Sequence, residues 1–167
     1  MESCNPYLHN VSVTAIIHKN GKYLITKRSP EKKAFPNKWT VPGGKLETSD
    51  YANLPKTTPG AWYGAVTETL KREVKEEVGL NISNIRYLID MTIIGSDNTP
   101  TIVLSFWAKY KGGTVKLDED SVDLAWVTLK EARRYDLIEG IWEEIEMVDK
   151  ILKGTSPERV KFKPRKY

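Results

Sequence analysis

The stretch Arg72–Leu80, Arg-Glu-Val-Lys-Glu-Glu-Val-Gly-Leu, constrains the fold of this chain most strongly. Its carboxylates Glu73, Glu76 and Glu77 stand at positions i, i+3 and i+4, so a helix places them on one face across a single turn. Like charges at this spacing repel. A hard divalent cation such as Mg²⁺ turns that repulsion into ligation, because it prefers carboxylate oxygens. The alternative is a solvated acidic face, and this stretch alone leaves both interpretations open.

An apolar stripe beside the acids indicates which side of this helix is buried. The stripe repeats every four residues and consists of Val66, Leu70, Val74 and Val78. At about 100° per residue, the carboxylates fall at the margin of the stripe. Gly79 is typical of the residue that closes a helix in the left-handed conformation. We therefore expect a helix over residues 61–78 whose acids open into a cleft.

Composition is that of one globular domain. The chain has 167 residues, of which 40% are hydrophobic and 29% charged, and this is enough to bury a core without disulfides or metals. The single cysteine, Cys4, has no partner for an internal disulfide. The N-terminus lacks the apolar run of a signal peptide, and no stretch is long enough to span a membrane. We expect a cytoplasmic location and no membrane association.

The net charge of +4 is concentrated at the C-terminus. Residues 158–167 carry five Lys or Arg against one acid, so the remainder of the chain is formally neutral. Nucleic acid is therefore not expected as a partner. We predict a single domain over residues 1–157, followed by a basic tail over residues 158–167 that is mobile and dispensable for catalysis.

Strand patterns flank the acidic helix on both sides. The first is a hairpin of Val11–Ile17 and Lys22–Lys27, joined by Asn20-Gly21, the residue pair that type I′ turns favour. The remaining strands are expected at Trp39–Val41, Tyr87–Ile94, Thr101–Tyr110 and Leu124–Val127, and a second helix at Ile138–Leu152. This order favours an α/β sandwich with a mixed sheet between helices.

With these motifs in order, the chain resembles the Nudix hydrolases. Their signature is a Gly, five residues, Glu, seven residues, then Arg-Glu-apolar-x-Glu-Glu-x-Gly-apolar. Arg72–Leu80 matches the second half at every specified position, and Trp39–Glu47 looks like the strand and loop that lead into it. The similarity covers roughly residues 10–152. It implies an α/β/α sandwich with a mixed β-sheet between helices.

One position departs from the family's pattern. The first Glu of the signature belongs eight positions before Arg72, where this chain has Gly64, and residues 45–63 separate Gly44 from Gly64 where the family has five. Three acids are candidates for the missing one: Glu47, Asp50 and Glu68. We expect weakened or altered metal binding, without automatic loss of activity.

The resemblance implies hydrolysis of a pyrophosphate bond in a nucleoside diphosphate linked to another moiety, such as a nucleoside triphosphate, with water attacking phosphorus. The cofactor would be Mg²⁺, with Mn²⁺ as a substitute. Glu73 and Glu77 would be the principal ligands, joined by Glu76 and the backbone carbonyl of Gly44. Arg72 would hold Glu73 in place. The alternative is a Nudix-fold nucleotide-binding or regulatory module with little or no turnover.

Further residues are candidates for the remaining roles. Asp120, in the run Asp118-Glu119-Asp120, is the candidate general base. The substrate-binding candidates are Gly43, Gly44 and Lys45, together with Trp39 as a stacking surface for the base; Phe35, Tyr23 and Trp107 are further aromatic candidates. The expected partner is a small nucleotide, and the oligomeric state is open, a homodimer included.

The stretch Glu47–Gly60 is rich in turn-forming residues and predicts a loop. Loops of this length in compact domains are usually functional or mobile. Because it leaves from Gly44 and returns just before the acidic helix, we predict that it acts as a lid or specificity loop. It would supply Asp50, Lys56 or a backbone group. A surface insertion with no role is the alternative.

Overall fold

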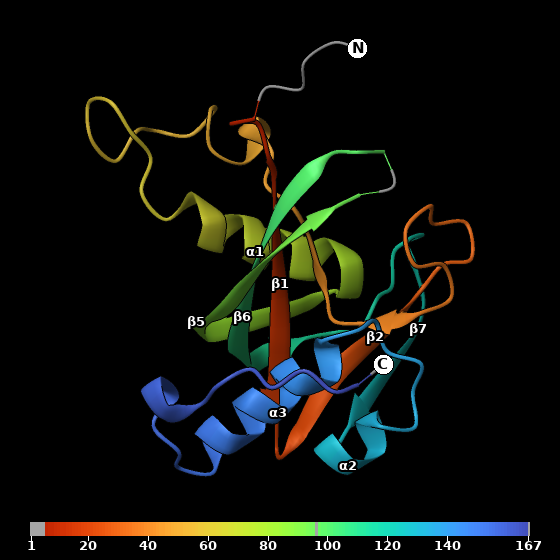
Figure 1. The fold of residues 1–167 in the computed structure, drawn as a ribbon. Coiled ribbons are helices and arrows are strands. Elements are labelled where there is room, and N and C mark those ends of the chain that lie inside the picture. Colours follow the sequence, from red (N-terminus) through yellow and green to blue (C-terminus); the bar gives the residue numbers. More distant parts are fainter. Residues whose placement is uncertain (1–5, 96, 167) are drawn as a thin grey trace.

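Residues 6–95 and 97–166 are described by the computed structural model. Cys4, the rest of the N-terminal five residues, Ser96 and Tyr167 lie outside the described residues. A mixed sheet forms the middle of the molecule, with α1 on one face and α3 on the other (Figure 1). This arrangement confirms the predicted α/β/α sandwich with a mixed sheet between helices.

Strands make up most of the regular structure, and α1 lies between the first four strands and the last three. They are β1 Asn10–Lys19, β2 Lys22–Arg28, β3 Trp39–Thr40, β4 Gly43–Lys45, β5 Leu80–Ile94, β6 Pro100–Gly113 and β7 Ser121–Val127. The helices are α1 Ala65–Val78, α2 Leu129–Ala132 and α3 Ile141–Leu152, with 3₁₀ turns η1 Thr48–Asp50 and η2 Pro157–Arg159.

The order of the strands is β3-β2-β1-β6-β5, with β4 paired to β1 and β7 paired to β2. β1 and β6 run parallel, and the other pairs are antiparallel. Asn20 and Gly21 both have positive φ, 49° and 73°, as a type I′ turn requires. In the sheet, β4 places Gly43 opposite Thr14 and Gly44 opposite Val13, so both glycines are fixed to a central strand.

Two hydrophobic clusters hold the layers together. On one face of the sheet, Leu70, Val74 and Val78 of α1 pack with buried residues of β1, β2 and β6. On the other face, Ile145 and Val148 of α3 pack on the sheet with residues of α2. The four-residue stripe predicted from sequence is therefore the buried face of α1, and Glu73 and Glu77 at its margin face β4.

Among the element boundaries, the starts of α1 and β5 differ most from the sequence-based expectation. α1 begins at Ala65 and not at residue 61, because Gly64 precedes it with a φ of 81°. β5 begins at Leu80, seven residues before the predicted start. Gly79 ends α1 with a φ of 74°, and Leu80 then pairs directly with Gly113. A left-handed glycine can thus join a helix to a strand without an intervening loop.

The C-terminal residues pack against α3, so the expectation of a mobile tail is wrong for the described part of the tail. Val160 is buried. The Arg165 Nε lies 2.5 Å from a carboxylate oxygen of Glu143, whose side chain is 1% exposed, and the Arg165 guanidinium lies 4.6 Å from the Trp142 ring. A buried carboxylate requires a cation, and Arg165 provides one. Division of the chain at residue 157 stays a prediction.

No helix in the described ranges is both long enough and apolar enough to cross a membrane.

Candidate active site

Glu77 lies at the centre of a hydrogen-bonded pocket formed by three strands. The backbone N–H of Gly43 donates to its Oε2 at 3.0 Å, and the hydroxyls of Ser121 and Thr26 donate to its Oε1 at 2.8 and 3.4 Å. Burial raises the pKa of the Glu77 carboxyl, while the Gly43 and Ser121 hydrogen bonds act in the opposite direction. The carboxylate is therefore held in one orientation and lacks full solvation.

Glu73 lies one turn earlier on α1 and is pressed against Gly44. A Cβ placed on Gly44 would lie 2.1 Å from Cδ of Glu73 and 2.2 and 2.3 Å from its two carboxylate oxygens. Only glycine therefore permits this approach of the backbone to the acid. Burial raises the pKa of the Glu73 carboxyl, and the neighbouring Arg72 lowers it. The sequence-predicted pairing of the glycine turn with the acidic helix is present in the structure.

Arg72 bridges three carboxylates beside the contact between Gly44 and Glu73. Its Nε and Nη2 bind the two oxygens of Asp50 at 2.5 and 3.1 Å. The same guanidinium lies 2.9 Å from Glu73 Oε1 and 2.8 Å from Glu76 Oε2. The side chain of Asp50 is 3% exposed, and the Arg72 guanidinium lowers its pKa to about 2. Arg72 therefore fixes Glu73 from one side while Gly44 confines it from the other.

Asp50, one of the three candidates for the missing Glu of the signature, is the most highly connected acid of the network around Arg72. Besides Arg72, it accepts a hydrogen bond from the Thr69 hydroxyl at 2.8 Å and one from the backbone N–H of Glu47 at 2.9 Å. Of the other two candidates, Glu68 pairs with Lys71 at 2.7 Å. The signal was in the sequence: five residues follow Gly44, as in the signature, and the next position is Asp50. Counting back from Arg72 led to Gly64, because the insertion follows Asp50.

The acidic loop before β7 approaches Glu77 through its first residue. The backbone N–H of Asp118 donates to the Glu77 carbonyl at 3.1 Å. Burial raises the pKa of the Asp118 carboxyl, which also accepts the backbone N–H groups of Asp120 and Ser121. Asp120 itself lies 2.5 Å from the Lys32 ammonium. Asp120 as general base stays a prediction, and Ser121 is a residue of the pocket that sequence reasoning missed.

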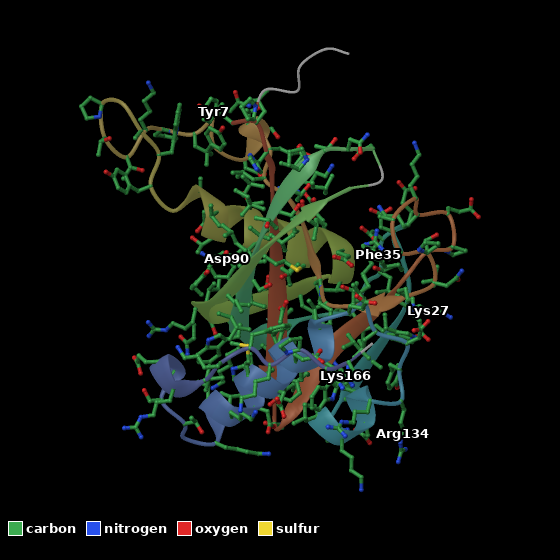
Figure 2. The ribbon with its side chains drawn as sticks, viewed as in Figure 1. Tyr7, Lys27, Phe35, Asp90, Arg134 and Lys166 are labelled. Atoms are coloured by element: carbon green, nitrogen blue, oxygen red, sulfur yellow. The ribbon has the colours of Figure 1, made fainter. Side chains whose placement is uncertain are left out.

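The predicted substrate-binding residues are not all in one place. Lys45 is exposed beside the site, and its carbonyl accepts a hydrogen bond from Arg72 at 3.3 Å. Trp39 packs edge-on to Tyr135, with ring centroids 4.7 Å apart, in the cluster on the α3 side of the sheet. Tyr23 is 1% exposed, so it is a core residue and not a stacking surface. Phe35 is exposed on the loop between β2 and β3 (Figure 2).

Residues 51–63, the insertion between Asp50 and α1, form a loop organised around Trp62. Tyr51 packs on Trp62 with ring centroids 5.4 Å apart, the indole N–H donates to the Leu54 carbonyl at 2.9 Å, and the Lys56 ammonium lies 5.2 Å from the ring. The loop projects beyond the N-terminal end of α1 (Figure 1). Its first residue neighbours Asp50, which the loop was expected to supply. Its role as a lid stays a prediction.

A divalent cation fits the donor chemistry of this site. Glu73, Glu76, Glu77 and the Gly44 carbonyl offer only oxygen atoms, the ligands that Mg²⁺ prefers. Burial raises the pKa of both Glu73 and Glu77 because their hydrogen bonds do not fully replace the lost solvation of the charged carboxylates. Within residues 6–95 and 97–166, no three acidic, imidazole or thiol side chains converge into a metal-binding group. Arg72 instead engages Glu73 and Glu76.

Comparison with protein families matches residues 7–149 to the NUDIX domain. Among curated proteins, the nucleoside triphosphatase NudI of Enterobacter sp. (strain 638) is 30% identical over 138 residues, which cover 77% of this chain and 88% of the relative. NudI of Escherichia coli (strain K12 / DH10B) is 27% identical over 136 residues, with 75% and 86% covered.

Solved structures show the same fold. A NUDIX hydrolase from Nitrosomonas europaea has a TM-score of 0.65 at 23% identity, covering 96% of this chain and 98% of the other. The NUDIX domain of Shewanella oneidensis NrtR, solved with ADP ribose, has a TM-score of 0.66 at 16% identity, covering 87% and 89%. At these identities the likeness concerns the fold alone.

Proposed function

Because the chain belongs to the NUDIX family and is a Nudix-type pyrophosphohydrolase, we propose that it hydrolyses nucleoside triphosphates or related small nucleotides in a divalent-metal-dependent reaction. The bond broken is a pyrophosphate bond in a nucleoside diphosphate linked to another moiety. The nucleoside triphosphatases at 27–30% identity support the choice of triphosphates as the first substrates to test.

The contact of Gly44 with Glu73 carries this proposal. Gly44 does not have the positive φ that disfavours residues with a side chain, so its backbone conformation does not explain why a glycine stands here. The absence of a side chain there instead lets a carboxylate reach β4, the short strand that pairs with the central strand β1. An acid that only faces solvent does not need to lie against the backbone of β4. A cation site does need this contact, because it gathers carboxylate and carbonyl oxygens around one ion.

In this proposal Glu73, Glu77 and the Gly44 carbonyl hold Mg²⁺, with Glu76 beside them, and Mn²⁺ substitutes for it. When bound, such a cation polarises phosphate oxygens and lowers the pKa of coordinated water. The remaining residues of the site orient the two carboxylates that would bind the cation. The Gly43 N–H and the Ser121 hydroxyl orient Glu77, and Arg72, anchored on Asp50, orients Glu73.

The reaction itself is a displacement at phosphorus. The oxygen of a water molecule forms a bond to phosphorus while the bridging P–O bond breaks, and the leaving phosphate keeps the electron pair. The water proton passes to a carboxylate acting as general base. Asp120 is our candidate and must leave Lys32 to act. Asp118 is the alternative, since it lies next to Glu77 with a raised pKa.

An active enzyme is favoured over a binding module by the network around Arg72. Asp50 restores an acidic partner at the sixth position after Gly44, where the signature has its first Glu, so the insertion does not leave the array incomplete. The expected partner is a small nucleotide, not a nucleic acid. The oligomeric state is left open, a homodimer included.

The test is a substrate panel with product nucleotides separated by chromatography. Nucleoside triphosphates, a nucleotide sugar, ADP-ribose and a dinucleoside polyphosphate are each incubated with Mg²⁺, Mn²⁺ or EDTA. We expect turnover of at least one triphosphate with metal and none with EDTA. Equal turnover in EDTA, or no turnover of any nucleotide with either metal, contradicts the proposal. Asp120→Asn and Asp118→Asn then identify the base, because only the true base should cost about 100-fold or more in kcat.

A further inference from the structure

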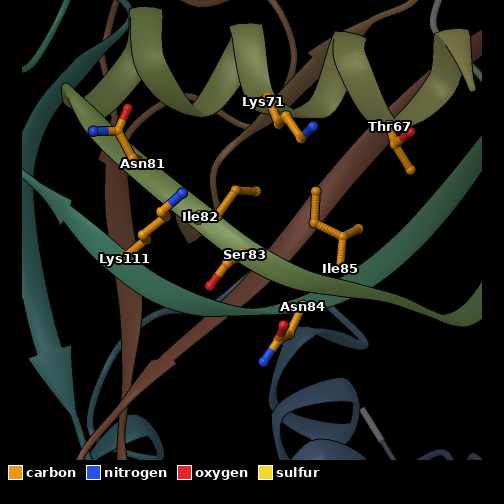
Figure 3. A pocket seen from close by; sticks show the side chains of 8 residues that line it. All are labelled: Thr67, Lys71, Asn81, Ile82, Ser83, Asn84, Ile85 and Lys111. Atoms are coloured by element: carbon orange, nitrogen blue, oxygen red, sulfur yellow. The ribbon is translucent and has the colours of Figure 1, made fainter.

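An open groove of about 660 Å³ lies between α1 and β5, outside the site described above (Figure 3). Its polar lining comes from three elements: Thr67 and Lys71 of α1, Asn81, Ser83 and Asn84 of β5, and Lys111 of β6. Ile82 and Ile85 provide its apolar part. The volume is in the range of small-molecule binding sites.

A β-bulge opens this groove. In the β5–β6 register, Ser83 pairs with Lys109 and Arg86 with Trp107, so two residues of β5, Asn84 and Ile85, stand opposite one residue of β6. Asn84 has a φ of 51°. Ile85 packs on the α1-side core, and Asn84 is exposed. Bulges of this kind re-aim side chains and are often found beside functional sites.

The groove is separate from the catalytic acids because it lies on the other side of α1. Lys71 and Glu73 differ by two positions, which is about 200° around a helix. Thr67, one turn before Lys71, lies on the same side as Lys71. The surface of α1 that meets Gly44 therefore cannot also line the groove.

The charge of the groove is positive. Its lining contains two lysines and no acid. Lys71 pairs with Glu68 at 2.7 Å on the helix surface, a bond that solvent screens. Lys111 is exposed and its side chain reaches toward Asn81 and Ile82 (Figure 3). Two ammonium groups, with amide and hydroxyl donors around them, suit a multiply charged oxyanion.

We propose that this groove binds a small polyphosphate anion without a metal ion, through Lys71 and Lys111. The absence of metal distinguishes this site from the catalytic one, whose carboxylates repel the same anion until a cation neutralises them. Asn81 of β5 and Thr67 of α1 line the same groove and offer further hydrogen-bond donors. The proposal does not depend on hydrolysis.

The experiment titrates inorganic pyrophosphate into the ¹⁵N-labelled full-length protein in EDTA and follows backbone amide shifts. We expect saturable shifts at residues 81–85 and 111 and at the Lys71 amide, weaker at higher ionic strength. The double variant Lys71→Ala/Lys111→Ala should bind about tenfold more weakly or worse. The single variant Lys111→Ala should also weaken binding, and Lys130→Ala on α2, which removes one charge outside the groove, is its matched control with unchanged affinity.

Three results overturn the proposal. One is the absence of saturable shifts in the groove at any pyrophosphate concentration up to solubility. Another is equal weakening by Lys130→Ala and by the single Lys111→Ala variant, which indicates nonspecific attraction to net charge. The third is binding that appears only with Mg²⁺ and shifts the amides of Gly43, Gly44 and Glu77, which places the anion in the catalytic site. A spectrum unchanged in dispersion shows that each variant is folded.

Discussion

The substitution Gly44→Ala tests the steric logic of the site with a single methyl group. The added Cβ would lie 2.1 Å from Cδ of Glu73, and an ordinary contact begins near 3.4 Å. The Glu73 carboxylate or β4 must therefore move by about 1.3 Å, the difference between those two distances. Gly44 does not require a left-handed backbone, so alanine brings no backbone strain of its own.

The displacement acts on an acid that is held from both sides. Arg72 binds Glu73 Oε1 at 2.9 Å and is itself anchored on Asp50, so the carboxylate cannot retreat without breaking that ion pair. A misplacement of about 1 Å near the chemistry costs about 100-fold in rate. Overpacking costs about 1–3 kcal/mol of stability. We expect kcat/KM to fall about 100-fold or more, with the fold retained.

The assay is kcat/KM on the best triphosphate at saturating Mg²⁺, together with the circular dichroism spectrum and Tm. Gly60→Ala is the matched control, because a Cβ there meets no atom within 4 Å and Gly60 also lacks a left-handed φ. It should leave the rate unchanged. A folded Gly44→Ala protein with a rate within threefold of wild type would refute the idea that Glu73 must lie against Gly44 of β4.

Three further outcomes follow from the charge network and from the other face of the sheet. Arg72→Ala should lower metal affinity and turnover by about 10–100-fold, since it leaves Asp50 and Glu73 without their cation; metal titrations measure this. Asp50→Asn keeps the shape but loses the charge, so a smaller loss, toward the tenfold end of the same range, is expected in the same titration. Burial raises the pKa of Glu144 to about 7 from 4.5, so folding stability should be fullest below pH 4.5 and decline as pH rises to about 7, by about 3 kcal/mol at most. Urea unfolding of Glu144→Gln should lack this decline, and an identical pH profile for both proteins would show that Glu144 ionises normally.

The parts of the fold that the sequence predicts are those with a local physical cause. Asn20-Gly21 defines its hairpin by backbone conformation alone, and the Leu70, Val74 and Val78 stripe defines the buried face of α1. Glu73 and Glu77 are recognisable because their spacing along a helix sets their proximity. Each of these inferences needs only neighbours within a turn or a strand.

The remaining features depend on contacts between distant residues. Arg165 packs because Glu143, 22 residues earlier, is buried and needs a cation, and no local pattern in the basic tail indicates this. Ser121 joins the site through a hydrogen bond to Glu77 across 44 residues. Asp50 lies between these two cases. Its spacing from Gly44 matches the signature and could be recognised from sequence, but the insertion after Asp50 places Gly64 at the position counted back from Arg72.

The most direct test of the account is the Mg²⁺ dependence of hydrolysis by wild type and by Glu77→Gln. Glu77 accepts hydrogen bonds from Gly43 and Ser121, and glutamine keeps its size while removing the charge that a hard cation requires. Glu68→Gln, an exposed acid on the same helix paired with Lys71, is the control. We predict that Glu68→Gln matches wild type, whereas Glu77→Gln stays folded and loses nearly all turnover at every Mg²⁺ concentration. A folded Glu77→Gln protein with the wild-type rate and the wild-type Mg²⁺ dependence would contradict the account.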